Sequence, residues 1–246
     1  QQEGENMPTI NPHGKEIIKV STELAGKPLT LEVNRVGFRT TASVLVTYGD
    51  TVVLGTAMVG SRPVQLDYFP LSIDYEEKFY AAGKIRGSRF FRRESKPTDE
   101  AICNARLIDR TIRPLFPQEL TREVQVVATV LSWDNQNEPD VLGILAASMA
   151  LSCSNIPWQG PTSAVRIGID GDNFILNPTY EQRGKGKVDV VFTATEKNNE
   201  LLINMIEGGF EEISEEIIIK AFQFAKPFLQ KLIDFQKEII KEIGEK

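Results

Sequence analysis

Apolar and polar residues alternate along the first third of the chain. Within residues 27–60, Leu29 and Leu31 fall on one side of an extended strand and their neighbours fall on the other. The tetrapeptide YGDT at 48–51 separates two such runs and is typical of a turn. The pattern predicts antiparallel hairpins. The stretch 61–97 that follows lacks this alternation and is expected to be a long loop.

Helical periodicity begins after that stretch. Thr98 is a suitable N-cap, acidic residues follow it in the first turn, and the predicted helix ends before Pro114. A strand is predicted over 123–133. A helix over 139–154 comes next, and it is expected to be buried because its residues are apolar on nearly every side.

The second half of the chain combines hairpins with a helix in the same way. Two hairpins are predicted over 163–178 and 187–208, each turning at adjacent Asp, Gly or Asn residues. The chain is strongly helical from Ser214 onward, and Pro227 is expected to kink or interrupt that helix. The order of elements predicts an α+β fold, in which two related layers of strands and helix form one domain.

The composition of the chain restricts the classes of protein and of site that are possible. The chain has 246 residues, of which 41% are hydrophobic and 25% charged, as in ordinary globular proteins. Cys103 and Cys153 are too few and too isolated for a disulfide framework or a CxxC zinc site. Their apolar or small neighbours predict buried thiols. We therefore expect a reducing, cytoplasmic location.

The N-terminus carries no apolar segment of the kind found in signal peptides. No run of the chain approaches the roughly 18 apolar residues of a membrane span, so we expect no membrane partner. Residues 1–12 are expected to be flexible. Met7 is expected to be the natural first residue, with residues 1–6 an addition to it.

Charge is distributed unevenly. The formal net charge is -6, but the segment 84–113 contains nine cations and four anions, which leaves it at +5 and the remainder at -11. A basic zone in an acidic protein predicts a specific anionic ligand rather than general affinity for nucleic acid. The alternative is a solvated surface in which the cations are paired with carboxylates.

Arg106, Arg110 and Arg113 are spaced so that they share one face of the predicted helix, within an arc of about 60°. A stripe of alanine and isoleucine lies roughly 130° away and is expected to pack inward. Arginine suits bidentate recognition of phosphate. The alternative is that Asp99, Asp109 or other carboxylates neutralise the arginines.

Two aromatic residues lie within the basic segment. In the stretch GSRFFRRESKP at 87–97, Phe90 and Phe91 are followed directly by Arg92 and Arg93. Exposed rings beside guanidiniums are typical of single-stranded nucleic-acid binding, because bases stack on the rings while arginines hold phosphates. The competing interpretation is that the phenylalanines pin the loop to the core, and the residues alone leave both open.

Several catalytic arrangements are excluded by what the chain lacks. His13 is its only histidine, so a Ser-His-Asp triad, a Cys-His dyad or a histidine-based metal site would all depend on that residue. No phosphate-binding loop of the GxxxxGK[ST] type is present.

The range 69–117 resembles the first ribonuclease PH-type half of bacterial polynucleotide phosphorylases, and the resemblance continues through 140–161. It implies a ribonuclease PH-like fold, also described as ribosomal protein S5 domain 2-like, over 13–212 with subparts 13–146 and 147–212. The helix over 213–246 would lead toward a helical linker domain.

The resemblance also implies an activity. Members of this family are phosphorolytic 3′→5′ exoribonucleases, which degrade RNA with inorganic phosphate to nucleoside diphosphates. It implies single-stranded RNA, a homotrimeric ring and ribonuclease E-type degradosome components as partners. By this resemblance Phe90, Phe91, Arg92 and Arg93 line a channel that grips RNA. Arg106 and Arg110, with Arg113 on the same face, belong to the phosphate-binding region.

One segment departs from the family's catalytic half. That half carries an acidic stretch followed by a lysine, which hold Mg²⁺ and the scissile phosphate. The corresponding range 181–192 has Arg183, Lys187 and Val191 at key positions and keeps only Asp189. The resemblance therefore implies that this chain contains no catalytic residue and no metal ligand, and that Mg²⁺ binds in the second half of the full-length enzyme.

Three alternatives remain open. The chain could be a free-standing ribonuclease PH that trims tRNA ends, although the missing acidic cluster argues against this. It could be a non-catalytic, RNA-binding scaffold subunit of an exosome-like ring. The arginines could also bind a small regulatory anion such as citrate.

Overall fold

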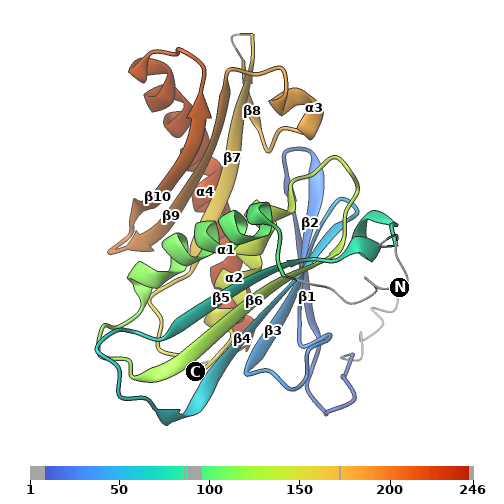
Figure 1. Cartoon of the computed structure of the whole chain (residues 1–246), viewed down its shortest axis with the longest axis vertical. Coiled ribbons are helices and arrows are strands. Elements are labelled where there is room, and N and C mark those ends of the chain that lie inside the picture. Colours follow the sequence, from blue (N-terminus) through green and yellow to red (C-terminus); the bar gives the residue numbers. More distant parts are fainter. Residues whose placement is uncertain (1–8, 86, 88–95, 172, 244–246) are drawn as a thin grey trace, which may run out of the picture.

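The structure is a computed structural model that describes residues 9–85, 87, 96–171 and 173–243. Ten strands form two sheets, and α-helices pack against both of them (Figure 1). The strands are β1 (Ile18–Leu24), β2 (Lys27–Val33), β3 (Ala42–Tyr48), β4 (Thr51–Pro63), β5 (Leu71–Glu77), β6 (Arg122–Ser132), β7 (Thr162–Asp170), β8 (Asn173–Leu176), β9 (Val188–Lys197) and β10 (Glu200–Phe210). The helices are η1 (Phe79–Ala82), α1 (Asp99–Ile112), η3 (Arg113–Leu115), α2 (Pro139–Ser152), α3 (Tyr180–Arg183) and α4 (Glu215–Ile243). The architecture confirms the predicted α+β class.

The first sheet has six strands in the order β1-β2-β3-β4-β6-β5. Neighbouring strands are antiparallel except β5 and β6, which pair in parallel from Leu71 opposite Val124 to Glu77 opposite Val130. The prediction of a long loop over 61–97 is therefore wrong for β5 and η1. A parallel pair needs a crossover, and α1 lies within the connection from β5 to β6.

The second sheet has four antiparallel strands in the order β10-β9-β7-β8. Both predicted hairpins are confirmed, and the second turns at Asn198 and Asn199, which adopt positive φ values of 55° and 61°. Asparagine tolerates this left-handed conformation better than most residues, which is why the turn forms there.

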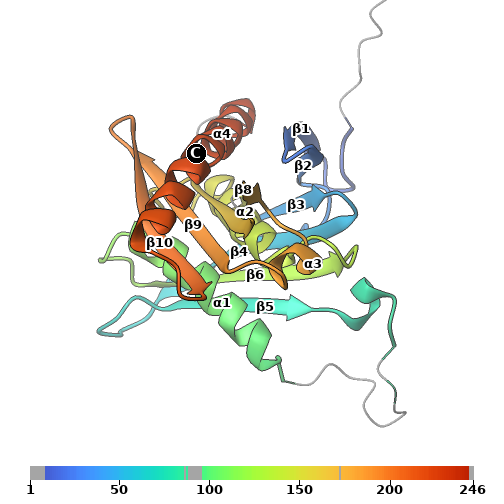
Figure 2. The same cartoon turned by 90° about the horizontal axis from the view of Figure 1, so that it is seen from above.

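Helix α2 lies between the two sheets and is buried along its entire length, as its sequence predicted. Seen from above, α2 lies between α1 and α4 (Figure 2). Its close approach to β4 depends on Gly55, because a Cβ atom there would lie 2.5 Å from the backbone of Ala146. The core is therefore shared by both sheets.

Helix α4 packs against β7, β9 and β1. It runs without a break through Pro227, so the predicted interruption does not occur. Pro227 is exposed, and water can therefore hydrate the carbonyl group that loses its helical donor. Among the described residues, no helix combines the length and the apolarity needed to cross a membrane.

Candidate functional site

Helix α1 presents the predicted arginine face. Its start is fixed because the Thr98 hydroxyl accepts a hydrogen bond of 3.1 Å from the backbone N–H of Ala101. Ala101, Ile108 and Ile112 are buried against the core. The opposite side is exposed, which confirms that the apolar stripe directs the arginines outward.

Cys103 lies on this exposed side, so the prediction that both thiols are buried is wrong. Its position three residues before Arg106 places both on the same outward face of α1. Cys153 is partly buried.

The three arginines have different surroundings. Arg113 donates to the Asp109 carboxylate through Nε at 2.9 and 3.0 Å and through a terminal nitrogen at 2.6 Å. It also donates to the backbone carbonyls of Phe69 at 3.4 Å and Leu71 at 3.2 Å. Arg113 therefore attaches α1 to the start of β5, and the interpretation that carboxylates neutralise the face holds for this residue.

Arg110 and Arg106 are more available. Arg110 forms one ion pair, with Glu207 on β10, and both side chains are about half exposed, at 54% each. Arg106 is exposed and contacts no carboxylate in the part of the chain that the structure describes. Among the described residues, Arg106 has no carboxylate partner and Arg110 has one exposed pair, which leaves guanidinium donors for an anionic ligand.

The aromatic and basic residues Phe90, Phe91, Arg92 and Arg93 lie outside the described residues. The part of the chain that leads to them is fixed, because the Trp133 backbone N–H donates to the Ala81 carbonyl of η1 at 3.0 Å. The described chain resumes at Lys96, and Thr98 caps α1, whose exposed side carries Arg106 and Arg110.

A second group of charged residues lies between the two sheets. Arg166 of β7 is buried, and its guanidinium donates to Asp189 of β9 at 2.5 Å and also to Asp140 of α2. Asp140 is itself buried and accepts a further bond of 2.5 Å from the Val141 backbone N–H. A buried arginine is thus paired with carboxylates from two different elements.

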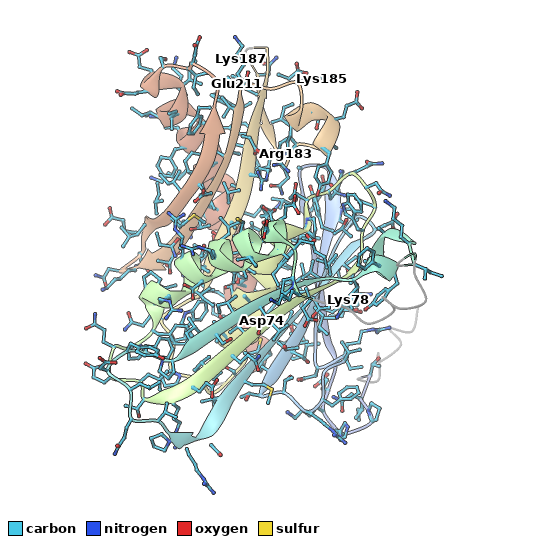
Figure 3. All side chains as sticks on the ribbon, viewed as in Figure 1. Asp74, Lys78, Arg183, Lys185, Lys187 and Glu211 are labelled. Atoms are coloured by element: carbon cyan, nitrogen blue, oxygen red, sulfur yellow. The ribbon has the colours of Figure 1, made fainter. Side chains whose placement is uncertain are left out.

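Arg183 extends this network. Its terminal nitrogen and Nε donate to Asp189 at 2.6 and 3.0 Å, and it pairs with Glu138 just before α2. Arg183 is the last residue of α3, and Figure 3 shows it lower in the view than Lys185 and Lys187. We call the set of Glu138, Asp140, Arg166, Arg183 and Asp189 the buried ion cluster.

The electrostatics of the cluster follow from its burial and its pairing. Burial raises the pKa of Asp140, and the adjacent Arg166 opposes that shift. Partial burial also favours protonation of Asp189, but its ion pairs with Arg166 and Arg183 outweigh this and lower its pKa. The cluster contains three carboxylates and two guanidiniums.

This cluster does not fit a magnesium ion. A divalent cation needs several free oxygen ligands, whereas each carboxylate here already pairs with a guanidinium. No group of three or more His, Cys, Asp or Glu side chains in the described part of the chain could hold a metal. The cluster instead joins the start of α2 to α3 and to the four-stranded sheet.

Arg183 and Asp189 were singled out from the sequence, whereas Arg166, Asp140 and Glu138 were missed. Arg166 and Asp140 could have been recognised from two features of the sequence. An arginine within the apolar strand SAVRIGI requires a buried anion, and an aspartate in the first turn of an all-apolar helix requires a buried cation. Glu138 gives no comparable signal.

Two family models match the chain. The model described as "3′ exoribonuclease family, domain 1" matches residues 25–157, and "3′ exoribonuclease family, domain 2" matches residues 160–226. The first range contains β2 to β6 and α2, and the second contains the four-stranded sheet.

Curated relatives match most of the chain. A polyribonucleotide nucleotidyltransferase of Thermus thermophilus is 44% identical over 221 residues, which cover 90% of this chain and 30% of the relative. One from Thermomicrobium roseum is 49% identical over 221 residues, covering 89% of this chain and 27% of the relative. The chain thus spans about a third or less of the length of these relatives.

A solved structure confirms the fold. The crystal structure of rice (Oryza sativa) Rrp46 superposes with a TM-score of 0.70 at 14% sequence identity, covering 97% of this chain and 98% of that chain. At this low identity the likeness concerns the fold alone.

Proposed function

The chain belongs to the 3′ exoribonuclease family, and on that premise we propose that it is the RNA-holding half of a phosphorolytic 3′→5′ exoribonuclease. In this proposal the full-length protein degrades RNA with inorganic phosphate as co-substrate and releases nucleoside diphosphates. The relatives named polyribonucleotide nucleotidyltransferase support it.

The observation that carries the proposal is the arginine face of α1. Arg106 and Arg110 project into solvent one turn apart, directly after the segment that carries the aromatic and basic residues. Guanidiniums in this arrangement can bind non-bridging oxygens of successive phosphates, while rings in the preceding segment stack with bases. The chain would thereby hold and orient an RNA strand.

Catalysis is assigned to the rest of the full-length protein. The carboxylates of the buried ion cluster are occupied by arginines, so this chain supplies neither a metal centre nor a general base there. Mg²⁺ would bind in the second half, where it would stabilise charge on the reacting phosphate. We further propose that the full-length protein forms a homotrimer in the cytoplasm and meets ribonuclease E-type components there.

An RNA-binding measurement tests the proposal. Fluorescence anisotropy of a labelled oligoadenylate would be recorded over a series of salt concentrations for the wild type, Arg106→Gln and Arg110→Gln. Arg122→Gln is the control, because it makes the same charge change at an exposed position at the start of β6. For single strands each lost phosphate contact lowers the slope of log affinity against log salt by about 0.7.

We expect this reduction for Arg106→Gln and Arg110→Gln and a smaller change for Arg122→Gln. Equal slopes for all three variants would show that the arginine face does not contact phosphates. A wild type that does not bind oligoadenylate would refute RNA holding altogether.

A further inference from the structure

Strand β10 holds a carboxylate against the arginine face. β10 is an edge strand, which pairs only with β9 in the described part of the molecule. Its register shifts between Ile203 and Met205, and Asn204 lies within this irregularity. A bulge of this kind redirects side chains locally, which suits a contact with a neighbouring helix.

Asn204 fixes β10 to α1. Its side-chain nitrogen donates to the Thr111 backbone carbonyl at 2.8 Å, and its side-chain oxygen accepts from the Thr193 hydroxyl at 2.6 Å. The first of these bonds joins the end of α1 to the middle of β10, and the second holds the Asn204 amide from the neighbouring strand β9. Glu207 lies three residues further along the same strand, at the level of Arg110.

Glu207 and Arg110 then form an ion pair across the junction. Both side chains are about half exposed, and a pair of this kind contributes little stability, because water and salt screen it. The pair therefore does not explain why α1 and β10 pack together, since Asn204 already joins them.

We propose that Glu207 competes with phosphate for Arg110 and so sets the affinity of the arginine face for its ligand. This inference rests on the proposed function and adds a residue that tunes it. A carboxylate and a phosphate oxygen bind the same kind of guanidinium N–H donor, and Glu207 occupies one terminal nitrogen of Arg110 and places a negative charge beside a phosphate bound there. Arg106 carries no such competitor among the described residues, and the two arginines therefore differ in their readiness to bind.

The effect of Glu207 on the affinity for the ligand can be worked out from the energy of an exposed ion pair. Competition from one exposed ion pair, together with the repulsion between Glu207 and a phosphate bound at Arg110, weakens binding by about two- to fivefold. Glu207→Gln keeps the shape of the side chain and removes its charge. We expect this variant to bind tighter by that factor.

The test uses the 246-residue chain, labelled oligoadenylate and inorganic phosphate as a competitor. Glu200→Gln is the matched control: Glu200 is exposed on the same strand and forms no ion pair with a described residue. Glu207→Gln would also be combined with Arg110→Gln, because an effect that acts through Arg110 must vanish when Arg110 is absent.

The inference predicts tighter oligoadenylate binding for Glu207→Gln, no comparable gain for Glu200→Gln, and no gain in the Arg110→Gln background. If inorganic phosphate is the ligand at Arg110, the gain appears in its inhibition constant instead, with the same dependence on Arg110. A gain that persists without Arg110, a gain of equal size for Glu200→Gln, or no gain with either probe would overturn the inference. Wild-type protein that binds oligoadenylate, while Glu207→Gln shows a gain with neither oligoadenylate nor inorganic phosphate, refutes the inference and leaves the proposed function standing.

Discussion

Replacing Arg166 with methionine tests the role of the buried ion cluster. Methionine fills much of the space of the arginine stem but removes the guanidinium that pairs with Asp140 and Asp189. Asp189 keeps Arg183 as a partner, whereas Asp140 keeps only the backbone N–H of Val141. The variant therefore leaves one buried carboxylate without a counter-charge.

The cost can be worked out from Asp140. At pH 7 this carboxylate either stays ionised in a buried site or takes up a proton. Protonation costs about 1.4 kcal/mol for each pH unit above its ordinary pKa near 3.9, which gives an upper limit of about 4 kcal/mol. Breaking a buried ion pair by removing one partner typically costs about 3–5 kcal/mol. We expect Arg166→Met to lower the free energy of unfolding by about 3–4 kcal/mol at pH 7.

Urea denaturation followed by circular dichroism would measure this loss at about pH 7 and about pH 5. In the variant the pKa of Asp140 in the folded state is raised further. The destabilisation caused by Asp140 therefore shrinks as the pH falls toward the pKa of this residue in the unfolded state. At pH 5 the upper limit on the free-energy cost of protonating Asp140 is only about 1.5 kcal/mol. The double variant Arg166→Met/Asp140→Asn removes both charges and should recover most of the stability. An equal loss at both pH values, with no recovery in the double variant, would refute the reasoning and point to lost packing.

Three further predictions follow from other contacts. Asp189→Asn should reduce the loss of stability as the pH falls below about 5, because the lowered pKa of Asp189 gives stability that disappears as the pH falls through its folded value; acid titration of the unfolding free energy checks this. Gly55→Ala should lower the unfolding free energy by about 1–3 kcal/mol or more, since its methyl group would overlap the Ala146 backbone; urea denaturation measures it. Cys103 should react with a thiol reagent in the folded protein faster than Cys153, and equal rates would contradict its exposure.

Local signals predicted much of the fold. The helix after Thr98 was predictable because its cap, its acidic first turn and its apolar stripe all lie within fifteen residues. The hairpin at Asn198 was also predictable, because its turn residues are adjacent in the sequence and fix the register of the two strands. The outward direction of Arg106 also follows from helical periodicity alone.

Features that depend on distant partners could not be predicted in this way. β5 forms because it pairs in parallel with β6, about fifty residues later in the chain, and the local sequence does not specify that partner. The roles of Arg113 and Arg110 depend on carbonyls and a carboxylate from other elements. The buried ion cluster unites residues from α2, β7, α3 and β9, and Glu138 just before α2, whose convergence only the tertiary fold shows.

The central claim is that this chain holds RNA but does not cleave it. The most direct test incubates the purified 246-residue chain with poly(A), inorganic phosphate and Mg²⁺, and measures bound RNA and released nucleoside diphosphate in the same sample. We predict that RNA binds, that Arg106→Gln weakens this binding, and that no nucleoside diphosphate is released above the protein-free blank. Sustained release by the chain alone, abolished when phosphate is omitted, would contradict the account.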